Sequence, residues 1–191
     1  MSINIISPEQ FNTVAWKNGL GQTTELAINE GGTLSDFDWR LSIASVTEDG
    51  IFSDFSGYDR HLVLISGQGI RLTHDDEKVD ELTQQLDMAI FDGGSKTYGK
   101  LSAGTIEDFN IMTKSGAYQA DIMRYRDQQT IKLKAKTQYF VYTLSTNSLI
   151  TFGKNEIVLP AQHLLSVANT NTNEILLHGE TLIVIQLTRT H

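Results

Sequence analysis

The sequence predicts an all-β protein of the sandwich or barrel class, with very little helix. Short runs rich in β-branched and aromatic residues recur about every ten residues, separated by Gly, Asn, Asp and Ser. No apolar i, i+3, i+4 pattern continues over three helical turns. An apolar share of 40% in 191 residues is enough for a packed core.

The predicted elements are almost all strands. The segment "SPEQF" (7–11) has Ser7 as an N-cap before Pro8, with Gln10 in capping-box register, which predicts one helical turn at most. We expect two strands joined as a hairpin around a turn at 66–69, and a charged, solvated loop at 73–82. The other predicted strands cover 23–29, 40–46, 107–112, 138–146, 148–160, 163–169 and 181–189.

Two β-rich halves follow one another without a low-complexity linker. The most Gly-rich connection is "FDGGSKTYGKLSAG" (91–104), and the junction falls within residues 100–125. We predict an N-terminal half at 1–110 and a C-terminal half at 111–191, packed as one structural unit.

Composition excludes several functions. Acidic residues outnumber basic ones by 23 to 15, a formal net charge of −8. Binding to nucleic acid or to anionic membranes needs clustered Lys and Arg, so we expect neither partner. The lack of cysteine excludes disulfides, thiolate nucleophiles and zinc–thiolate sites. No apolar run reaches the roughly 18 residues of a membrane span, and we expect a cytoplasmic protein.

Two early strands place a charged residue among small residues on one face. These faces carry Glu25 and Ala27, opposite Leu26 and Ile28, and Arg40, Ser42 and Ala44, opposite Leu41 and Ile43. A sheet surface facing solvent is the commoner arrangement. However, alanine is depleted in strands, so the small residues favour a barrel interior. If the strands are neighbours, Glu25 and Arg40 pair there and leave guanidinium donors for a carboxylate ligand.

The segment "AWKNGLGQTTELAI" (15–28) concentrates specific chemistry before the core begins. It is either a turn that feeds a strand or the rim of a small-molecule site. In the second interpretation Trp16 supplies a stacking wall and Lys17 contacts a carboxylate. Asn18 and Thr24 then orient polar groups.

Two further segments carry candidate ligand-binding residues. "GIFSDFSGYDR" (50–60) is too irregular for a strand, so its aromatic residues either plug a barrel end or line a ligand site. Its Asp59 and Arg60 form a local salt bridge or orient a ligand. "EDFNIM" (107–112) places Asp108 and Asn110 on one side of a strand, for a ligand or for capping a turn.

Motifs for cofactors and common catalytic sites are missing. The five histidines are scattered, with no HxH or HxxxH pair, so we expect no metal. "NGLGQT" lacks the surrounding strand–helix unit of a dinucleotide site, and there is no GxSxG. We expect no cofactor.

The chain resembles the HutD/Ves family of bacterial proteins. The resemblance rests on "WKNGLGQTTELA" (16–27), "FDWRLSIASV" (37–46), "GIFSDFSGYDRHLVLISGQGIRL" (50–72) and "LSAGTIEDFNIM" (101–112). It implies an RmlC-like double cupin, or bicupin, built from two jelly-roll barrels. It also implies a modulatory link to histidine utilisation and small carboxylate ligands such as urocanate or formylglutamate, with no established enzymatic activity. The sequence departs from the family at Leu20, where relatives commonly have glycine.

Our leading hypothesis is a cytoplasmic cupin that binds a small anionic metabolite. One alternative is a metal-independent isomerase or hydrolase with Glu25 as general base. Another is a protein-interaction module that uses exposed sheet edges. We leave a homodimer open.

Overall fold

The computed structural model describes residues 2–16, 21–134, 137–168 and 175–190. Within these residues the regular secondary structure is almost entirely β-strand, as predicted, and the helical element is a 3-10 helix at Pro8–Gln10. The Ser7 backbone N–H donates to Gln10 Oε1 at 3.0 Å, so the predicted single turn is confirmed. No helix among the described residues is long and apolar enough to cross a membrane.

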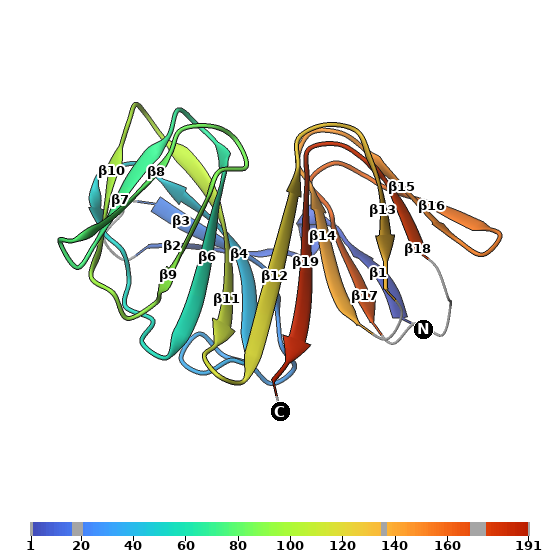
Figure 1. Ribbon diagram of the computed structural model, residues 1–191, viewed down its shortest axis with the longest axis horizontal. Coiled ribbons are helices and arrows are strands. Elements are labelled where there is room, and N and C mark those ends of the chain that lie inside the picture. The colour runs from blue at the N-terminus through green and yellow to red at the C-terminus, as the bar shows by residue number, and fades with distance from the viewer. Residues whose placement is uncertain (1, 17–20, 135–136, 169–174, 191) are drawn as a thin grey trace. The chain divides into compact units, whose positions relative to one another are not determined.

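The chain divides into two compact units (Figure 1). The N-terminal unit is Phe11–Tyr118, and the C-terminal unit is Gln119–Thr190 together with Met1–Gln10. The predicted boundary between the two halves, at residues 110 and 111, lies inside strand β11 (Ile106–Lys114). That strand pairs on both sides within the N-terminal unit, so the chain crosses to the other unit only after it.

The N-terminal unit consists of a six-stranded and a four-stranded sheet. The first has the order β2 (Asn12–Ala15), β3 (Gly21–Ile28), β4 (Trp39–Val46), β11, β6 (Tyr58–Ser66) and β9 (Met88–Asp92). The second has the order β5 (Gly50–Ile51), β10 (Thr97–Leu101), β7 (Ile70–His74) and β8 (Lys78–Leu82). Buried residues of both sheets, such as Leu62, Leu72 and Leu82, form one core.

The C-terminal unit repeats this plan with a five-stranded and a four-stranded sheet. The five-stranded sheet has the order β1 (Ser2–Ile6), β17 (Leu164–Ala168), β14 (Gln138–Thr143), β19 (Leu182–Arg189) and β12 (Tyr118–Tyr125). The four-stranded sheet has the order β13 (Gln129–Leu133), β18 (Ile175–Gly179), β15 (Ser148–Phe152) and β16 (Asn155–Leu159). Its described core is mainly aliphatic, with Ile150, Leu165 and Leu177 fully buried. Because β1 pairs with β17, the first strand belongs to this unit.

Two predicted connections are wrong. β6 and β7 flank the turn at 66–69 but lie in different sheets, so this turn is a passage between sheets and not a hairpin. Segment 73–82 is a hairpin of β7 and β8 and not a loop, with Asp75 and Asp76 in the left-handed region at φ 52° and 60°. We predicted a loop because most side chains of this segment are charged and exposed; only His74 and Leu82 are buried.

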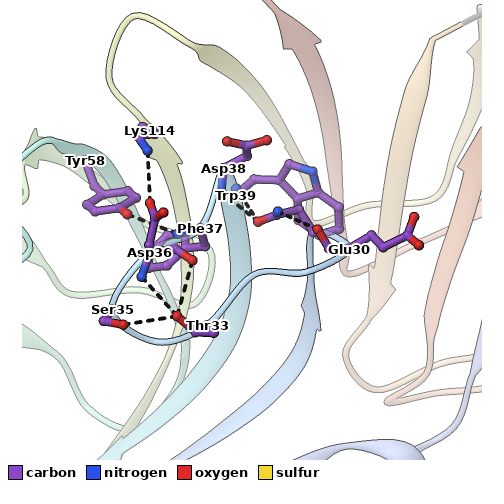
Figure 2. A network of polar contacts seen from close by, with 10 residues as sticks. Glu30, Thr33, Ser35, Asp36, Phe37, Asp38, Trp39, Tyr58 and Lys114 are labelled. Atoms are coloured by element: carbon purple, nitrogen blue, oxygen red, sulfur yellow. Dashed lines mark hydrogen bonds and ion pairs between the residues drawn. The ribbon is translucent and has the colours of Figure 1, made fainter.

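The loop between β3 and β4 places Phe37 against Tyr58, and we call these two residues the aromatic plug. Figure 2 shows the polar contacts that hold it, including Lys114 Nζ to Asp36 Oδ1 at 2.9 Å and Asp36 N–H to Thr33 Oγ1 at 3.3 Å. Phe37 is thereby buried against Tyr58, with ring centroids 4.1 Å apart, and its N–H donates to the Tyr58 hydroxyl. This plug lies where β4 and β6 begin and β11 ends.

Candidate functional site

The Glu25–Arg40 pair forms in the interior of the N-terminal unit. β3 and β4 are neighbours, and Glu25 lies opposite Ser42. Arg40 Nε donates to Glu25 Oε2 at 2.6 Å. Arg40 is only 7% exposed and Ser42 1% exposed, so a solvent-facing surface is excluded and the predicted pairing is confirmed.

The predicted alternation of side chains along β3 is wrong after Glu25, because the strand register shifts between Glu25 and Ala27. Beyond this β-bulge, Ala27 lies opposite Leu41 and Ile28 lies opposite Arg40. Since cross-strand partners share a face, Ile28 and not Ala27 joins the interior face. The prediction failed here because a bulge adds a residue without an obvious sequence signal.

Three neighbouring strands add further polar groups to the same face. Asn110 on β11 lies opposite Ser42 on β4, and Asp108 lies opposite Ala44. Met112 lies between Arg40 on β4 and Arg60 on β6. We call Glu25, Arg40, Ser42, Arg60, Asp108 and Asn110 the polar cluster. Apart from Glu25, every member is buried, with between 0% and 7% of its surface exposed.

Asn110 links Arg60 to Asp108. Arg60 Nη2 donates to Asn110 Oδ1 at 2.9 Å, and Asn110 Nδ2 donates to Asp108 Oδ1. Two buried atoms remain: Arg60 Nε and Asp108 Oδ2 have no hydrogen-bond partner among the residues that the structure describes. Because unsatisfied buried polar atoms are costly, this pair is a candidate point of contact for a ligand.

Aromatic rings surround the Arg60 guanidinium. Its Cζ lies 5.6 Å from the ring centroid of Phe52, 5.5 Å from that of Phe55 and 5.1 Å from that of Phe91. Such cation–π contacts stabilise a desolvated guanidinium. Phe52 and Phe55 enclose Arg60, and Phe55 also packs against the plug to which Tyr58 belongs. A role of these rings in lining a ligand site stays a prediction.

Burial dominates the electrostatics of the cluster. It raises the pKa of Asp108 to about 7, against the opposing effects of the Arg60 charge and the Asn110 hydrogen bond. It lowers the pKa of Arg60 to about 10, with Asp108 opposing and the Arg40 charge adding to the shift. With Asp108 partly protonated near pH 7, the positive charges of the cluster outnumber the negative ones.

A buried histidine that the sequence did not single out lies next to the cluster. His74 packs against Phe91, with ring centroids 4.5 Å apart and the ring planes tilted by 36°. Its Nδ1 lies 2.8 Å from Thr97 Oγ1 and its Nε2 lies 3.1 Å from Asp80 Oδ2. Burial lowers the pKa of His74, with Asp80 opposing. The alternation of buried Ile70, Leu72 and His74 along β7 is the signal that could have identified it.

Thr24 does not face the cluster, and the described contacts of Trp16 are with the apolar core and Thr23. Trp16 is partly buried against the core, and its Nε1–H donates to Thr23 Oγ1 at 2.7 Å. Thr24 exchanges a hydrogen bond with Thr13 on an exposed surface instead. Thr23, two residues before Glu25, is thus the threonine of the interior face, which strict alternation would have indicated.

The predicted Asp59–Arg60 salt bridge is wrong. Adjacent strand residues point to opposite faces, so Arg60 is buried while Asp59 is exposed and accepts from Ser115 Oγ at 2.9 Å. The predictions for Lys17, Asn18 and Leu20 lie outside the described residues.

The cluster does not fit a metal ion. No group of three or more His, Asp or Glu side chains in the described part of the chain could hold one. Two guanidinium groups would also repel a cation. A surface depression lined by Arg71, Glu81, Lys100 and neighbouring residues contains none of the predicted site residues.

The paired antiparallel sheets of each unit define the class as a double cupin. Among solved structures, oxalate decarboxylase from Lactobacillus farciminis has this fold, with a TM-score of 0.67 at 8% identity over 98% of this chain and 86% of that one. The HutD family model matches residues 8–185, and the chain belongs to the HutD family.

Three relatives illustrate the membership. The structure of HutD from Pseudomonas fluorescens SBW25 in the formate condition matches with a TM-score of 0.85 and 30% identity over 100% of both chains. An uncharacterized 21.2 kDa protein in the hutC 3′ region of Pseudomonas putida is 30% identical over 81% of this chain and 80% of its own length. Protein Ves from Escherichia fergusonii is 36% identical over 56% of each chain.

Proposed function

We propose that the polar cluster binds a small carboxylate metabolite and that the protein thereby modulates histidine utilisation. The observation that carries the proposal is a pair of buried guanidinium groups, Arg40 and Arg60, on one interior face. The Arg40 charge acts on Arg60, where it adds to the lowering of the Arg60 pKa by burial. An anion between them would relieve this repulsion.

The donors suit a carboxylate in particular. Arg60 Nε has no partner among the described residues, and a guanidinium binds a carboxylate in a planar, charge-assisted arrangement. Phe52, Phe55 and Phe91 add apolar surface beside that group, which suits a metabolite with a flat or apolar body. Glu25 is the most exposed member of the cluster, with 26% of its side chain accessible, so the cluster reaches solvent on the β3 side.

The relatives narrow the candidates. The HutD of Pseudomonas fluorescens is described in a formate condition, and the Pseudomonas putida relative lies in a hutC region. Urocanate and formylglutamate are carboxylates that fit this context, and they are our first candidates. The ion pair with Arg40 engages Glu25 Oε2, which favours binding over a general-base role for Glu25.

Binding is tested by calorimetry and thermal unfolding with formate, urocanate and N-formylglutamate. A carboxylate at a hundred times its Kd should stabilise the fold by about 2.7 kcal/mol. The corresponding uncharged amides should give no shift. Chromatography of the recovered compounds distinguishes binding from turnover, and a consumed compound would favour the enzyme alternative.

Variants locate the site. Arg60→Gln should weaken binding at least tenfold, and Arg60→Lys should weaken it as well, since lysine lacks the Nε donor. The matched control is Arg71→Gln, because Arg71 is 55% exposed and pairs with Glu81 outside the cluster. Circular dichroism verifies the fold of each variant. Equal binding by Arg60→Gln and Arg71→Gln would contradict the proposed site.

The link to histidine utilisation has its own test. Deletion of the gene should alter growth on histidine as sole nitrogen source, and the Arg60→Gln variant should fail to restore the original growth. Full restoration by that variant would separate the physiological role from the polar cluster.

A further inference from the structure

Asp108 occupies the deepest position of the polar cluster. It is fully buried, at 0% exposure, on β11 between β4 and β6. Its Oδ1 accepts a hydrogen bond from Asn110 Nδ2, and its Oδ2 has no partner among the described residues. Asn110 is held in this orientation because its own Oδ1 accepts from Arg60.

This arrangement distinguishes the two carboxyl oxygens. Oδ1 already accepts a hydrogen bond, so a proton on the carboxyl group would lie on Oδ2. A protonated Oδ2 is a donor without an acceptor in the described part of the protein. An ionised Asp108, in contrast, would repel an anion that approaches Arg60.

We propose that Asp108 binds the carboxylate ligand as a neutral carboxylic acid whose Oδ2–H donates a hydrogen bond to the ligand, so that binding takes up one proton wherever Asp108 is ionised in the free protein. This inference rests on the proposed function. The ligand's carboxylate would accept from Arg60 Nε and Asp108 Oδ2, the buried atoms of the polar cluster that have no hydrogen-bond partner among the described residues. The proton comes from the solvent when Asp108 was ionised beforehand.

The charged groups around Asp108 come from several elements. From β6, Arg60 lowers its pKa, and on its own strand Glu107 raises it. Arg40 extends the cluster on β4, where its charge acts on Arg60, and is paired with Glu25 from β3. Burial outweighs these charges and raises the pKa of Asp108 to about 7.

The facing sheet contributes His74 on β7 and its partner Asp80 on β8. Burial lowers the pKa of His74 below its ordinary value of 6.5, so this imidazole is largely neutral above pH 7. Arg60, with a pKa of about 10, stays charged throughout this range. Proton uptake above pH 7 that disappears in Asp108→Asn therefore identifies Asp108.

These pKa values determine the direction in which the ligand affinity changes with pH. Below about pH 7 Asp108 is neutral before the ligand arrives, so affinity is independent of pH there. Above that value the free protein has lost the proton that the complex needs. Affinity should therefore fall about tenfold for each further pH unit.

The experiment is calorimetry with N-formylglutamate between pH 6 and pH 9, a range in which its carboxylates stay ionised. The wild-type Kd should be constant near pH 6 and rise tenfold per unit above about pH 7. At pH 8, buffers of different ionisation enthalpy should report the uptake of about one proton.

The decisive variant is Asp108→Asn, whose amide donates a hydrogen bond at every pH. It should bind N-formylglutamate with a Kd that does not change between pH 6 and pH 9. The matched control is Glu81→Gln, which removes an exposed carboxylate that pairs with Arg71 outside the cluster and should keep the wild-type profile.

Two results would overturn the inference alone: wild-type binding without pH dependence, or Asp108→Asn binding with the wild-type slope. If Asp108→Asn fails to fold, the buffer series on the wild-type protein decides. Carbon-13 NMR adds a test without ligand, since a carboxyl of Asp108 that titrates near pH 4 also contradicts the inference. No binding of any carboxylate at any pH would instead overturn the proposed function, and this inference with it.

Discussion

Arg40 is stabilised by one carboxylate that is itself partly open to solvent. The Arg40 Nε to Glu25 Oε2 distance is 2.6 Å, and the two side chains are 8% and 26% exposed. A charge this deep depends on its partner more strongly than a surface charge does, because water cannot replace the lost interaction. Another ion pair between neighbouring strands, Arg71 with Glu81, is 55% and 59% exposed.

These two pairs give a direct comparison. Glu25→Gln removes the charge that neutralises Arg40 and should lower the free energy of unfolding by about 1–3 kcal/mol, less than a fully buried pair because Glu25 is partly solvated. Glu81→Gln should lower it by under about 1 kcal/mol. Urea unfolding at pH 7 measures both. Losses of equal size would mean that burial does not set the importance of the Arg40 pair.

Residue-level prediction succeeded where strict alternation applies and failed where pairing between distant strands decides. Alternation brought Glu25 and Arg40 together and put Asp108 beside Asn110. It gave no indication that β11 would lie centrally in the sheet, and that position is what buries Asp108 and raises its pKa. Whether these residues bind a ligand stays a prediction.

At the scale of elements, the passage from β6 to β7 sends the chain from one sheet to the other. Gly67 adopts φ 98° and Gly69 adopts φ 115°, backbone conformations that side chains with a Cβ rarely adopt. A Cβ at Gly67 would also lie 2.7 Å from Thr105 O and 2.7 Å from Ile106 Cγ2. The turn is therefore restricted both by its dihedral angles and by space.

Alanine at Gly67 should be costly. We expect Gly67→Ala to lower the free energy of unfolding by at least about 2 kcal/mol, since strain and overlap act together. Gly50→Ala is the matched control, because no atom lies within 4 Å of its added Cβ; its effect should stay within about 0.5 kcal/mol. Thermal unfolding compares them, and a tolerant Gly67 would refute this account of the turn.

The sequence located most strands, but it could not tell a hairpin from a passage between sheets. The Ser66–Gly69 turn has the Gly and Ser content typical of both, and the choice depends on where β6 and β7 find partners. Those partners, β11 and β10, lie further along the chain. The double cupin was predicted from family resemblance and strand spacing together, and the fold comparison confirms it.

At the scale of the molecule, the two units are unequal in chemistry. The interior of the N-terminal unit holds the polar cluster, whereas the described core of the C-terminal unit is mainly aliphatic. The C-terminal unit also includes a strand from the opposite end of the sequence, since β1 pairs with β17 from Ser2↔Ala168 to Ile6↔Leu164. Ile3 and Ile5 on this strand pack against the aliphatic core.

The cytoplasmic location stays a prediction, and so does the possible homodimer.

Removing β1 should weaken the C-terminal unit selectively. Deletion of residues 1–7 removes the strand that pairs with one edge of β17, whose other edge pairs with β14, and we expect amide exchange in β17 and β14 to accelerate at least tenfold. Peptides from β3 and β4, which do not pair with β1, should change less. Glu9→Gln in the exposed 3-10 helix is the control, with exchange like the wild type. Uniform acceleration across both units would contradict this expectation.

The position of β1 has a consequence for how a cell makes this protein. A ribosome delivers Ser2–Ile6 before its partner Leu164–Ala168, and the continuous stretch from Phe11 to Tyr118 emerges between them. The nascent chain can fold that stretch while β1 is still unpaired, because the pairing of β1 with β17 spans a large sequence separation and forms late. Chaperones that bind extended apolar segments would therefore meet Ile3 and Ile5 early in translation.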